Sequence, residues 1–158
     1  MNVKPKKYLG QHFLLDNTVS QRIAEAIKIE NKVNLLEIGP GTGALTQFLM
    51  GENINLIAYE LDKDSITYLN KNFPELTVHN QDILKIEWKS IFKANFTVTG
   101  NFPYNISSQI IFKIYENRDT IDQMVGMFQK EVAERICSST GTKKYGILSV
   151  LILSLIHI

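Results

Sequence analysis

The chain has 158 residues, of which 44% are hydrophobic, and its formal net charge is +1. This length predicts one globular domain, residues 1–158, with a buried core, and leaves no room for a second domain of ordinary size. The near-neutral charge excludes a strong overall attraction to nucleic acid, so any such contact must be local. The single Cys137 and the lysine-rich start, which does not resemble a signal peptide, predict a cytoplasmic protein.

Along the chain, apolar runs alternate with segments of helical period, which is typical of a mainly parallel sheet flanked by helices. The fold class is therefore α/β. Strands are expected near residues 34–38, 54–60, 76–80, 95–100 and 123–128. Helices are expected near residues 17–29, 44–50, 62–73, 107–116 and 129–138. The three histidines are scattered, without a paired Cys or Asp at ligand spacing, so no metal site is expected.

Lysines gather at the amino end of the chain, where Lys4, Lys6 and Lys7 precede the segment 8–15. A basic arm ahead of aromatic and amide side chains can follow a phosphate backbone. Terminal lysines that simply face solvent are the alternative.

A glycine-rich loop follows the first expected strand, with Gly39, Gly41 and Gly43 ahead of a helical segment. The third glycine comes too early for the G-x-G-x-x-G loop that binds dinucleotides, and the nearby Glu37 would repel a pyrophosphate. The same carboxylate would attract the ammonium or sulfonium of S-adenosylmethionine, or it would orient the loop by accepting backbone N–H bonds. The loop favours S-adenosylmethionine, and a dinucleotide-dependent oxidoreductase is the alternative.

Acidic residues follow the next two expected strands. Glu60 lies about 20 residues past the glycine loop, where a carboxylate accepts hydrogen bonds from ribose hydroxyls in this class of fold. Asp82 follows the third strand and can meet an adenine amine while Ile83 packs on the ring. Each acid taken alone fits an ordinary turn residue better. Because ligands of open α/β sheets bind at the carboxyl ends of the strands, these residues are expected to share one pocket.

The motif Asn101-Phe102-Pro103-Tyr104 follows the fourth expected strand. The Asn101 side chain can accept a hydrogen bond from an exocyclic amine, and Pro103 turns the Phe102 carbonyl outward as a second acceptor. Tyr104 can then stack on the base, while Ser107 and Ser108 are expected to cap the next helix. A strand that ends in a proline turn with a core aromatic is the alternative.

With these residues assembled, the chain resembles the ribosomal RNA adenine N6,N6-dimethyltransferases. The resemblance covers about residues 6–150 and rests on these segments: 10–14 (GQHFL), 37–43 (EIGPGTG), Glu60, 81–82 (QD), 100–107 (GNFPYNIS) and 129–135 (QKEVAER). It implies a Rossmann-like methyltransferase fold. It also implies that the enzyme depends on S-adenosylmethionine and uses no metal.

The resemblance also implies roles for single residues. His12 and Leu14 would close over the cofactor, and Gly39, beside Gly41, would line its amino-acid part. Glu60 would bind the ribose, Asp82 with Ile83 the adenine, and Asn101 would touch both the cofactor and the target base.

The chain resembles the housekeeping branch of this family more closely, since segments 8–14 and 143–150 are similar to the sequences typical of that branch. The substrate implied is a pair of adjacent adenosines in the 3′-terminal hairpin of 16S ribosomal RNA, methylated in the immature 30S particle by a monomer. The alternatives are a large-subunit (23S) methyltransferase of the antibiotic-resistance type and a non-catalytic RNA-binding assembly factor.

The apolar tail 147–158 departs from the family, whose members continue with further strands and a helical domain that are missing here. Residues 152–158 are expected not to match the family, and weak or no methylation is expected of this fragment. The tail is too short to span a bilayer, which takes about 20 apolar residues, and is expected to form a helix that packs on the sheet.

Overall fold

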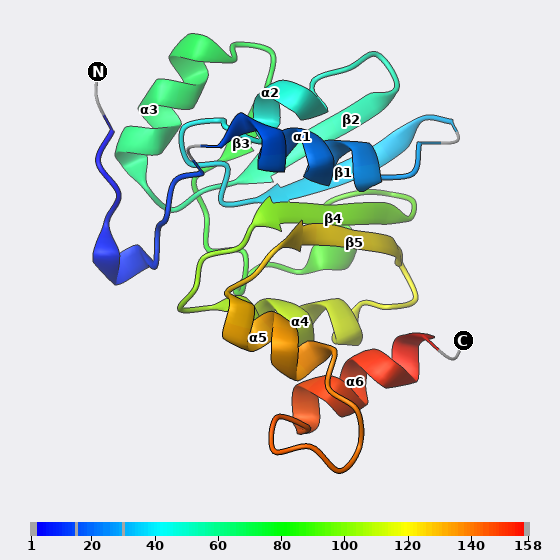
Figure 1. Ribbon diagram of the computed structural model, residues 1–158. Helices are drawn as coiled ribbons and strands as arrows, with labels where there is room; N and C mark the ends of the chain where they lie inside the picture. The colour runs from blue at the N-terminus through cyan, green and yellow to red at the C-terminus, as the bar shows by residue number, and fades with distance from the viewer. Residues whose placement is uncertain (1–2, 15, 30, 157–158) are drawn as a thin grey trace.

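The computed structural model describes residues 3–14, 16–29 and 31–156 and contains one five-stranded sheet in the order β3-β2-β1-β4-β5 (Figure 1). All four neighbouring pairs of strands are parallel, and Leu36 at the centre lies opposite Ile57 and Val98. The strands are β1 (Val33–Ile38), β2 (Ile54–Tyr59), β3 (Thr77–His79), β4 (Phe96–Asn101) and β5 (Ile121–Met127). This confirms the expected parallel α/β fold.

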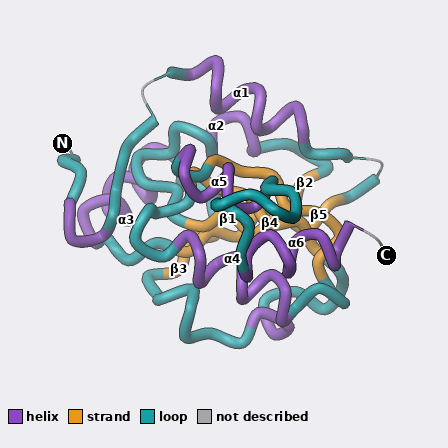
Figure 2. Tube along the Cα trace, turned by 60° about the horizontal axis from the view of Figure 1, so that its bottom comes forward, coloured by secondary structure: helices purple, strands orange, loops and turns teal. Residues whose placement is uncertain are grey.

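Helices lie on both faces of the sheet, with α1 and α2 on one side of the strands and α4 and α6 on the other (Figure 2). The helices are α1 (Asn17–Ala26), α2 (Thr46–Leu49), α3 (Lys63–Asn72), α4 (Ser107–Glu116), α5 (Lys130–Ile136) and α6 (Ile147–Ile156). Two 3₁₀ turns occur at Lys7–Leu9 and Trp88–Ser90. Side-chain caps fix two of the helix starts, because Asp16 accepts the Thr18 N–H and Asp62 accepts the Asp64 N–H.

The core is built on both faces of the same strands, which is why β1 is a nearly continuous apolar run. Leu36 and Val98 pack under α4, whereas Leu35 and Ala58 belong to the cluster that contains α1, α2 and α3. With both faces covered, the ends of the strands are the places where polar side chains of the sheet can meet a ligand.

The tail helix α6 forms as expected, but the prediction that it packs on the sheet is wrong. It lies against α4 and α5 (Figure 1), and Leu148 is buried together with Ile111 and Ile136. The reason is that α4 is apolar on two sides: Ile110 faces the sheet core, and Ile111 offers a second surface to α6. Within the described residues, no helix combines the length and the apolar character that crossing a membrane requires.

Candidate functional site

A cavity of about 280 Å³ lies at the carboxyl ends of β1, β2 and β4. Its walls come from the amino-terminal arm, the glycine loop and the segments that follow β2, β3 and β4. All twelve residues for which the sequence predicts a cofactor-binding or catalytic role line it: His12, Leu14, Glu37, Gly39, Gly41, Glu60, Asp82, Ile83, Asn101, Phe102, Pro103 and Tyr104. The structure therefore brings these residues together, while their individual roles remain predictions.

The glycine loop is tied to the end of β2 by a hydrogen bond. Gly41 has a φ of 57°, in the left-handed region that glycine adopts at little cost, and its N–H donates to Glu60 Oε2 at 3.0 Å. This bond holds the loop close to the carboxylate, so both border the same cavity.

Glu60 is held rigidly by backbone donors. Its Oε1 accepts the N–H groups of Leu61 at 2.8 Å and Asp62 at 2.9 Å, in addition to the Gly41 bond at Oε2. Burial raises the pKa of Glu60, while these N–H bonds oppose the rise. Because a carboxylate oxygen has two lone pairs, Oε2 keeps one acceptor position for a ligand hydroxyl.

Glu37 is only 1% exposed, and its Oε2 accepts a hydrogen bond from the Thr46 hydroxyl at 2.8 Å. Burial and, to a smaller extent, the nearby charge of Glu60 raise the pKa of Glu37 to about 8, while the Thr46 hydrogen bond opposes the rise. Of the two roles predicted for Glu37, acceptance of the loop N–H bonds is wrong in the described structure, since Gly41 donates to Glu60. The attraction of a cation stays a prediction, and a positive charge in the cavity would stabilise the ionised form of Glu37.

The segment after β3 forms an apolar wall with one acid beside it. Ile83 is buried, and its carbonyl accepts the Trp88 indole N–H at 2.8 Å, which anchors the segment. Asp82 Oδ1 accepts the Leu84 N–H at 3.0 Å, so the carboxylate is fixed beside Ile83. A flat apolar ring with a polar edge suits this pair.

Asn101 has one satisfied and one unsatisfied side-chain atom. Its Nδ2 donates to the His12 carbonyl at 2.6 Å, whereas its Oδ1 is buried and has no partner among the residues that the structure describes. A buried acceptor without a donor is costly, and such atoms often mark the position of a ligand. The orientation of the amide leaves its oxygen available for an amine.

The turn after Asn101 is fixed by the core. The Phe102 side chain is fully buried, and the backbone N–H of Phe102 donates to the Met127 carbonyl at 3.1 Å. The prediction that Ser107 and Ser108 cap α4 is wrong, because both lie inside the helix and the N-cap is Ile106. The Ser107 hydroxyl donates instead to the Pro103 carbonyl at 3.0 Å. Ser107 thus holds the proline turn in place.

Tyr104 is not free on both faces. Its ring stacks on the His12 imidazole with centroids 4.4 Å apart and an interplanar angle of 25°. One face on which a base was expected to stack is therefore already covered.

The amino-terminal arm is attached at both ends. Lys6 pairs with Asp62 and with Asp64, and these hydrogen bonds raise the pKa of the Lys6 ammonium. Lys6 is therefore paired with acids at the start of α3, contrary to the prediction that it belongs to a free basic arm. At the other end Gly10, with a φ of 62°, packs so tightly that a Cβ there would collide with the Asn105 side chain.

Sequence reasoning missed the contacts of three residues that hold the site together: Lys6, Thr46 and Asp62. The Asp62 cap is readable from the chain as an acid directly before a helix. Lys6 and Thr46 have no such signal, since their partners Asp62 and Glu37 lie in other elements that only folding brings close. No group of three His, Cys, Asp or Glu side chains suited to a metal occurs in the described ranges.

Comparison with known proteins gives consistent matches. The family model described as "Ribosomal RNA adenine dimethylase" matches residues 2–157. The match includes most of the segment 152–158. The expectation that this segment departs from the family stays a prediction. The chain is 51% identical to "Ribosomal RNA small subunit methyltransferase A" of Parabacteroides distasonis over 152 residues, which is 95% of this chain and 57% of that protein. The protein of the same name from Flavobacterium johnsoniae is 48% identical, over 94% of this chain and 58% of its own length.

Two solved structures are also similar. A dimethyladenosine transferase from Plasmodium falciparum superposes with a TM-score of 0.74 at 32% identity, over 90% of this chain and 52% of that one. The 23S rRNA methyltransferase ErmE superposes with a TM-score of 0.71 at 30% identity, over 90% and 56% respectively. The chain thus spans little more than half the length of the relatives it matches.

Proposed function

Because this chain belongs to the ribosomal RNA adenine dimethylase family, we propose that it is the S-adenosylmethionine-binding catalytic part of an enzyme that dimethylates adenosine N6 in 16S ribosomal RNA. The finer target is the pair of adjacent adenosines in the 3′-terminal hairpin. The proposal includes action on the immature 30S particle, as a monomer in the cytoplasm.

Sequence similarity supports the small-subunit substrate over the large-subunit one. Curated relatives named for the small subunit are 44% to 51% identical to this chain, whereas the 23S enzyme is 30% identical. The distinction matters because both kinds of enzyme share the fold.

The cavity fits S-adenosylmethionine, which supplies an activated methyl group when bound. Glu37 and Glu60 place two buried carboxylates beside the glycine loop, where they suit a cationic amino-acid part and ribose hydroxyls. Asp82 and Ile83 offer an acceptor and an apolar wall to the adenine. Gly39 and Gly41 leave space for close approach of the ligand to the backbone.

The observation that carries the proposal is the buried, unpartnered Asn101 Oδ1. Adenine N6 is a poor nucleophile, since its lone pair is conjugated with the ring. Asn101 Oδ1 and the Phe102 carbonyl can accept its two N–H bonds, which favours a nitrogen whose lone pair is free to accept the methyl. Once methylated, N6 carries a positive charge and loses a proton to water, so the site needs no strong base.

A methylation assay tests this function. Immature small subunits are incubated with the protein and radiolabelled S-adenosylmethionine, and label is expected in dimethylated adenosines of the 16S RNA, with label in the 23S RNA as the outcome for the resistance-type enzyme. A longer version that includes the region present in relatives is run in parallel. Absence of label from both versions contradicts the enzyme and favours the assembly-factor alternative.

The dinucleotide alternative is tested separately by calorimetric titration with S-adenosylmethionine and with NADH. Binding of S-adenosylmethionine and not of NADH is expected, because Glu37 and Glu60 disfavour a pyrophosphate beside the loop. Binding of NADH alone would contradict the cofactor assignment.

A further inference from the structure

We propose that Glu37 makes the cavity selective for ligands with a charged amine, because it holds a proton while the cavity is empty and releases it when the amine enters. This role rests on the part of the proposed function that makes S-adenosylmethionine the ligand. The exchange is balanced: one proton leaves the carboxyl group for solvent as one ammonium arrives, and no covalent bond to the ligand forms.

The charges around the cavity are unbalanced. Three acids line it, Glu37, Glu60 and Asp82, whereas no lysine or arginine is among the lining residues that the structure describes. Lys6 of the amino-terminal arm is paired with Asp62 and Asp64 instead. A cavity with this composition favours a ligand that brings a positive charge.

Glu37 is the least compensated of the three acids. It is 1% exposed, and its one hydrogen bond among the described residues comes from the neutral Thr46 hydroxyl at 2.8 Å. Glu60, in contrast, accepts three backbone N–H groups, and Asp82 is half-buried. A buried carboxyl group without a cation keeps its proton, because burial disfavours the charged form. The pKa of Glu37, raised by burial to about 8, agrees with this geometry.

Donors that suit the ionised form are already present beside Glu37. Thr99 of β4 lies opposite Glu37 in the parallel pair with β1, so the two side chains are on the same face of the sheet. The Thr99 hydroxyl is buried and has no partner among the described residues. A carboxylate with free lone pairs can satisfy this hydroxyl directly or through a water. Thr46 and Thr99 therefore stabilise the anion once the proton has left.

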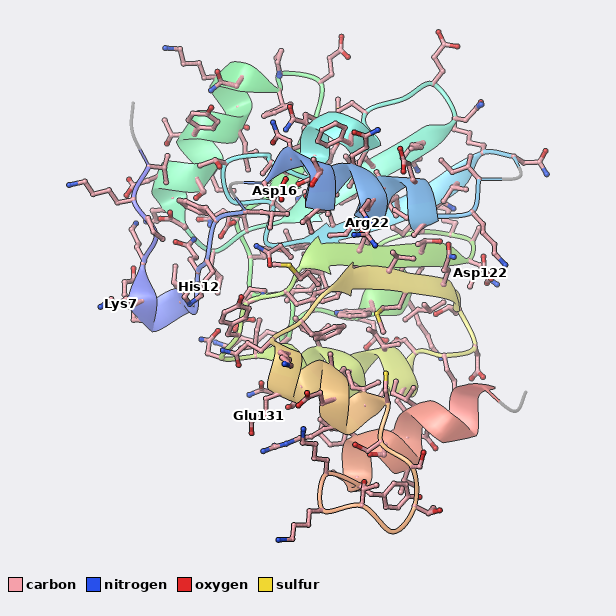
Figure 3. The ribbon with its side chains drawn as sticks, viewed as in Figure 1. Lys7, His12, Asp16, Arg22, Asp122 and Glu131 are labelled. Carbon is pink, nitrogen blue, oxygen red and sulfur yellow. The ribbon has the colours of Figure 1, made fainter. Side chains whose placement is uncertain are left out.

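The other elements packed around Glu37 do not supply a counter-ion. The helix α2 has no charged residue and β4 has none, and the charged residues of α1 and its N-cap are exposed; they are Asp16, Arg22 and Glu25, and Figure 3 labels the first two. Tyr59 also lines the cavity, and burial raises the pKa of its phenol, which stays neutral at pH 7. His12 is exposed and is the other lining group able to titrate near pH 7, so the experiment must separate it from Glu37.

Calorimetry with two ligands tests the proton release. S-adenosylhomocysteine carries the amine, whereas 5′-methylthioadenosine has the same adenosine and thioether without the amino-acid part. Each is titrated into the protein at a pH of about 6.5, where an α-amino group is already charged, in buffers of different ionisation enthalpy. S-adenosylhomocysteine is expected to release about 1 proton per ligand and 5′-methylthioadenosine less than about 0.2. Equal release by both ligands, or none by S-adenosylhomocysteine, would overturn the proposal.

Glu37→Gln identifies the source of the proton. In the unsubstituted protein the affinity for S-adenosylhomocysteine is expected to rise by up to about 10-fold per pH unit between about pH 5.5 and 7, because the bound state holds fewer protons. Glu37→Gln should bind with no such rise and release less than about 0.2 proton, whereas the exposed Glu131→Gln, the matched control, should keep both effects. Release that persists in Glu37→Gln would place the proton on His12 or Glu60 and contradict the proposal.

Thr46 offers a second test that keeps the acid in place. Thr46→Val removes a donor that lowers the pKa of Glu37, so it should weaken S-adenosylhomocysteine binding at pH 6.5 about 5-fold and move the pH at which affinity levels off upward. Thr46→Ser keeps the hydroxyl and should bind within about 2-fold of the unsubstituted protein. Weaker binding by Thr46→Val without a change in pH dependence would count against the proton exchange. Because no measurement uses RNA, a failure of methyl transfer would refute the proposed function alone.

Discussion

At the amino ends of the strands, polar side chains satisfy one another, whereas at the carboxyl ends they leave atoms unpaired. Asn55 donates to Asn34 at 2.9 Å, Asn34 to the Asn95 carbonyl at 3.0 Å, and Asn95 to Asp122 at 2.7 Å. The hollow there is larger, about 570 Å³ against about 280 Å³. Asn101 Oδ1, which has no partner among the described residues, nevertheless borders the smaller one, so volume alone does not locate the site.

Buried acids show the same asymmetry. Among the described residues, the buried carboxylates are Glu37, Glu60 and Asp62, and all three lie at the carboxyl ends of β1 and β2 or just beyond them. Burying a carboxylate is unfavourable unless something compensates. At this edge the compensation comes from backbone N–H groups, Thr46 and Lys6, and a cationic ligand would add to it.

The largest effect is expected when the unpaired acceptor is removed. Asn101→Ala should lower the rate of methyl transfer about 100- to 1,000-fold, because the N6 protons lose a fixed partner, while S-adenosylmethionine binding is largely kept. The measurement is single-turnover transfer to small-subunit RNA. Asn34→Ala, the control at the satisfied end, should cost about 1 kcal/mol of stability and leave the rate unchanged. Normal turnover by Asn101→Ala would overturn the comparison.

The next effect concerns Glu60, the buried acid that accepts three backbone N–H bonds. Glu60→Ala should weaken S-adenosylmethionine binding roughly 100-fold, since both the ligand and the Gly41 N–H lose an acceptor. Isothermal titration calorimetry measures it, with the exposed Glu52→Ala as the control. Equal affinity in the two variants would show that the carboxyl edge does not hold the cofactor through this residue.

The third effect is the pH dependence of stability without cofactor. The folded pKa of Glu37 is about 8 and its ordinary value is 4.5, so the folded state holds an extra proton between these pH values. Stability should therefore fall as pH rises through this window, by at most about 1.4 kcal/mol per pH unit from this residue. Glu60, whose pKa is also raised, contributes with the same sign.

Urea unfolding at several pH values measures this slope. Glu37→Gln should flatten the curve partly, while the exposed Glu131→Gln should not change it. Stability that rises with pH between 5 and 8 in the unsubstituted protein, with a slope that Glu37→Gln abolishes, would contradict the raised pKa.

The smallest effect is expected at the arm. Lys6→Met removes the pairs with Asp62 and Asp64 and should weaken S-adenosylmethionine binding about 3-fold, since a partly exposed ion pair contributes little. Added salt should lower the S-adenosylmethionine affinity of the unsubstituted protein toward that of Lys6→Met. Lys7→Met is the matched control, since Lys7 is exposed and has no ion pair among the described residues. A similar loss in both variants would mean that charge alone, and not attachment to α3, matters.

Much of the site was predictable because its residues stand at strand ends. Apolar runs located the strands, and parallel strands bring their carboxyl ends to one edge, so Glu37, Glu60, Asp82 and Asn101 had to converge. The contacts of the arm were not predictable in this way. Lys6 meets Asp62 across 56 residues, and nothing near Lys6 in the chain indicates that partner.

The sequence by itself determined the parallel sheet, the family and the set of residues around the cavity, since periodicity, glycine spacing and strand ends are local properties. The tertiary structure alone decided which atoms are paired: Gly41 to Glu60, Thr46 to Glu37, His12 to both Asn101 and Tyr104, and α6 to α4 and α5. The physical reason is that hydrogen bonding and stacking depend on distances of a few ångströms between segments far apart in the chain, which packing of the whole domain sets.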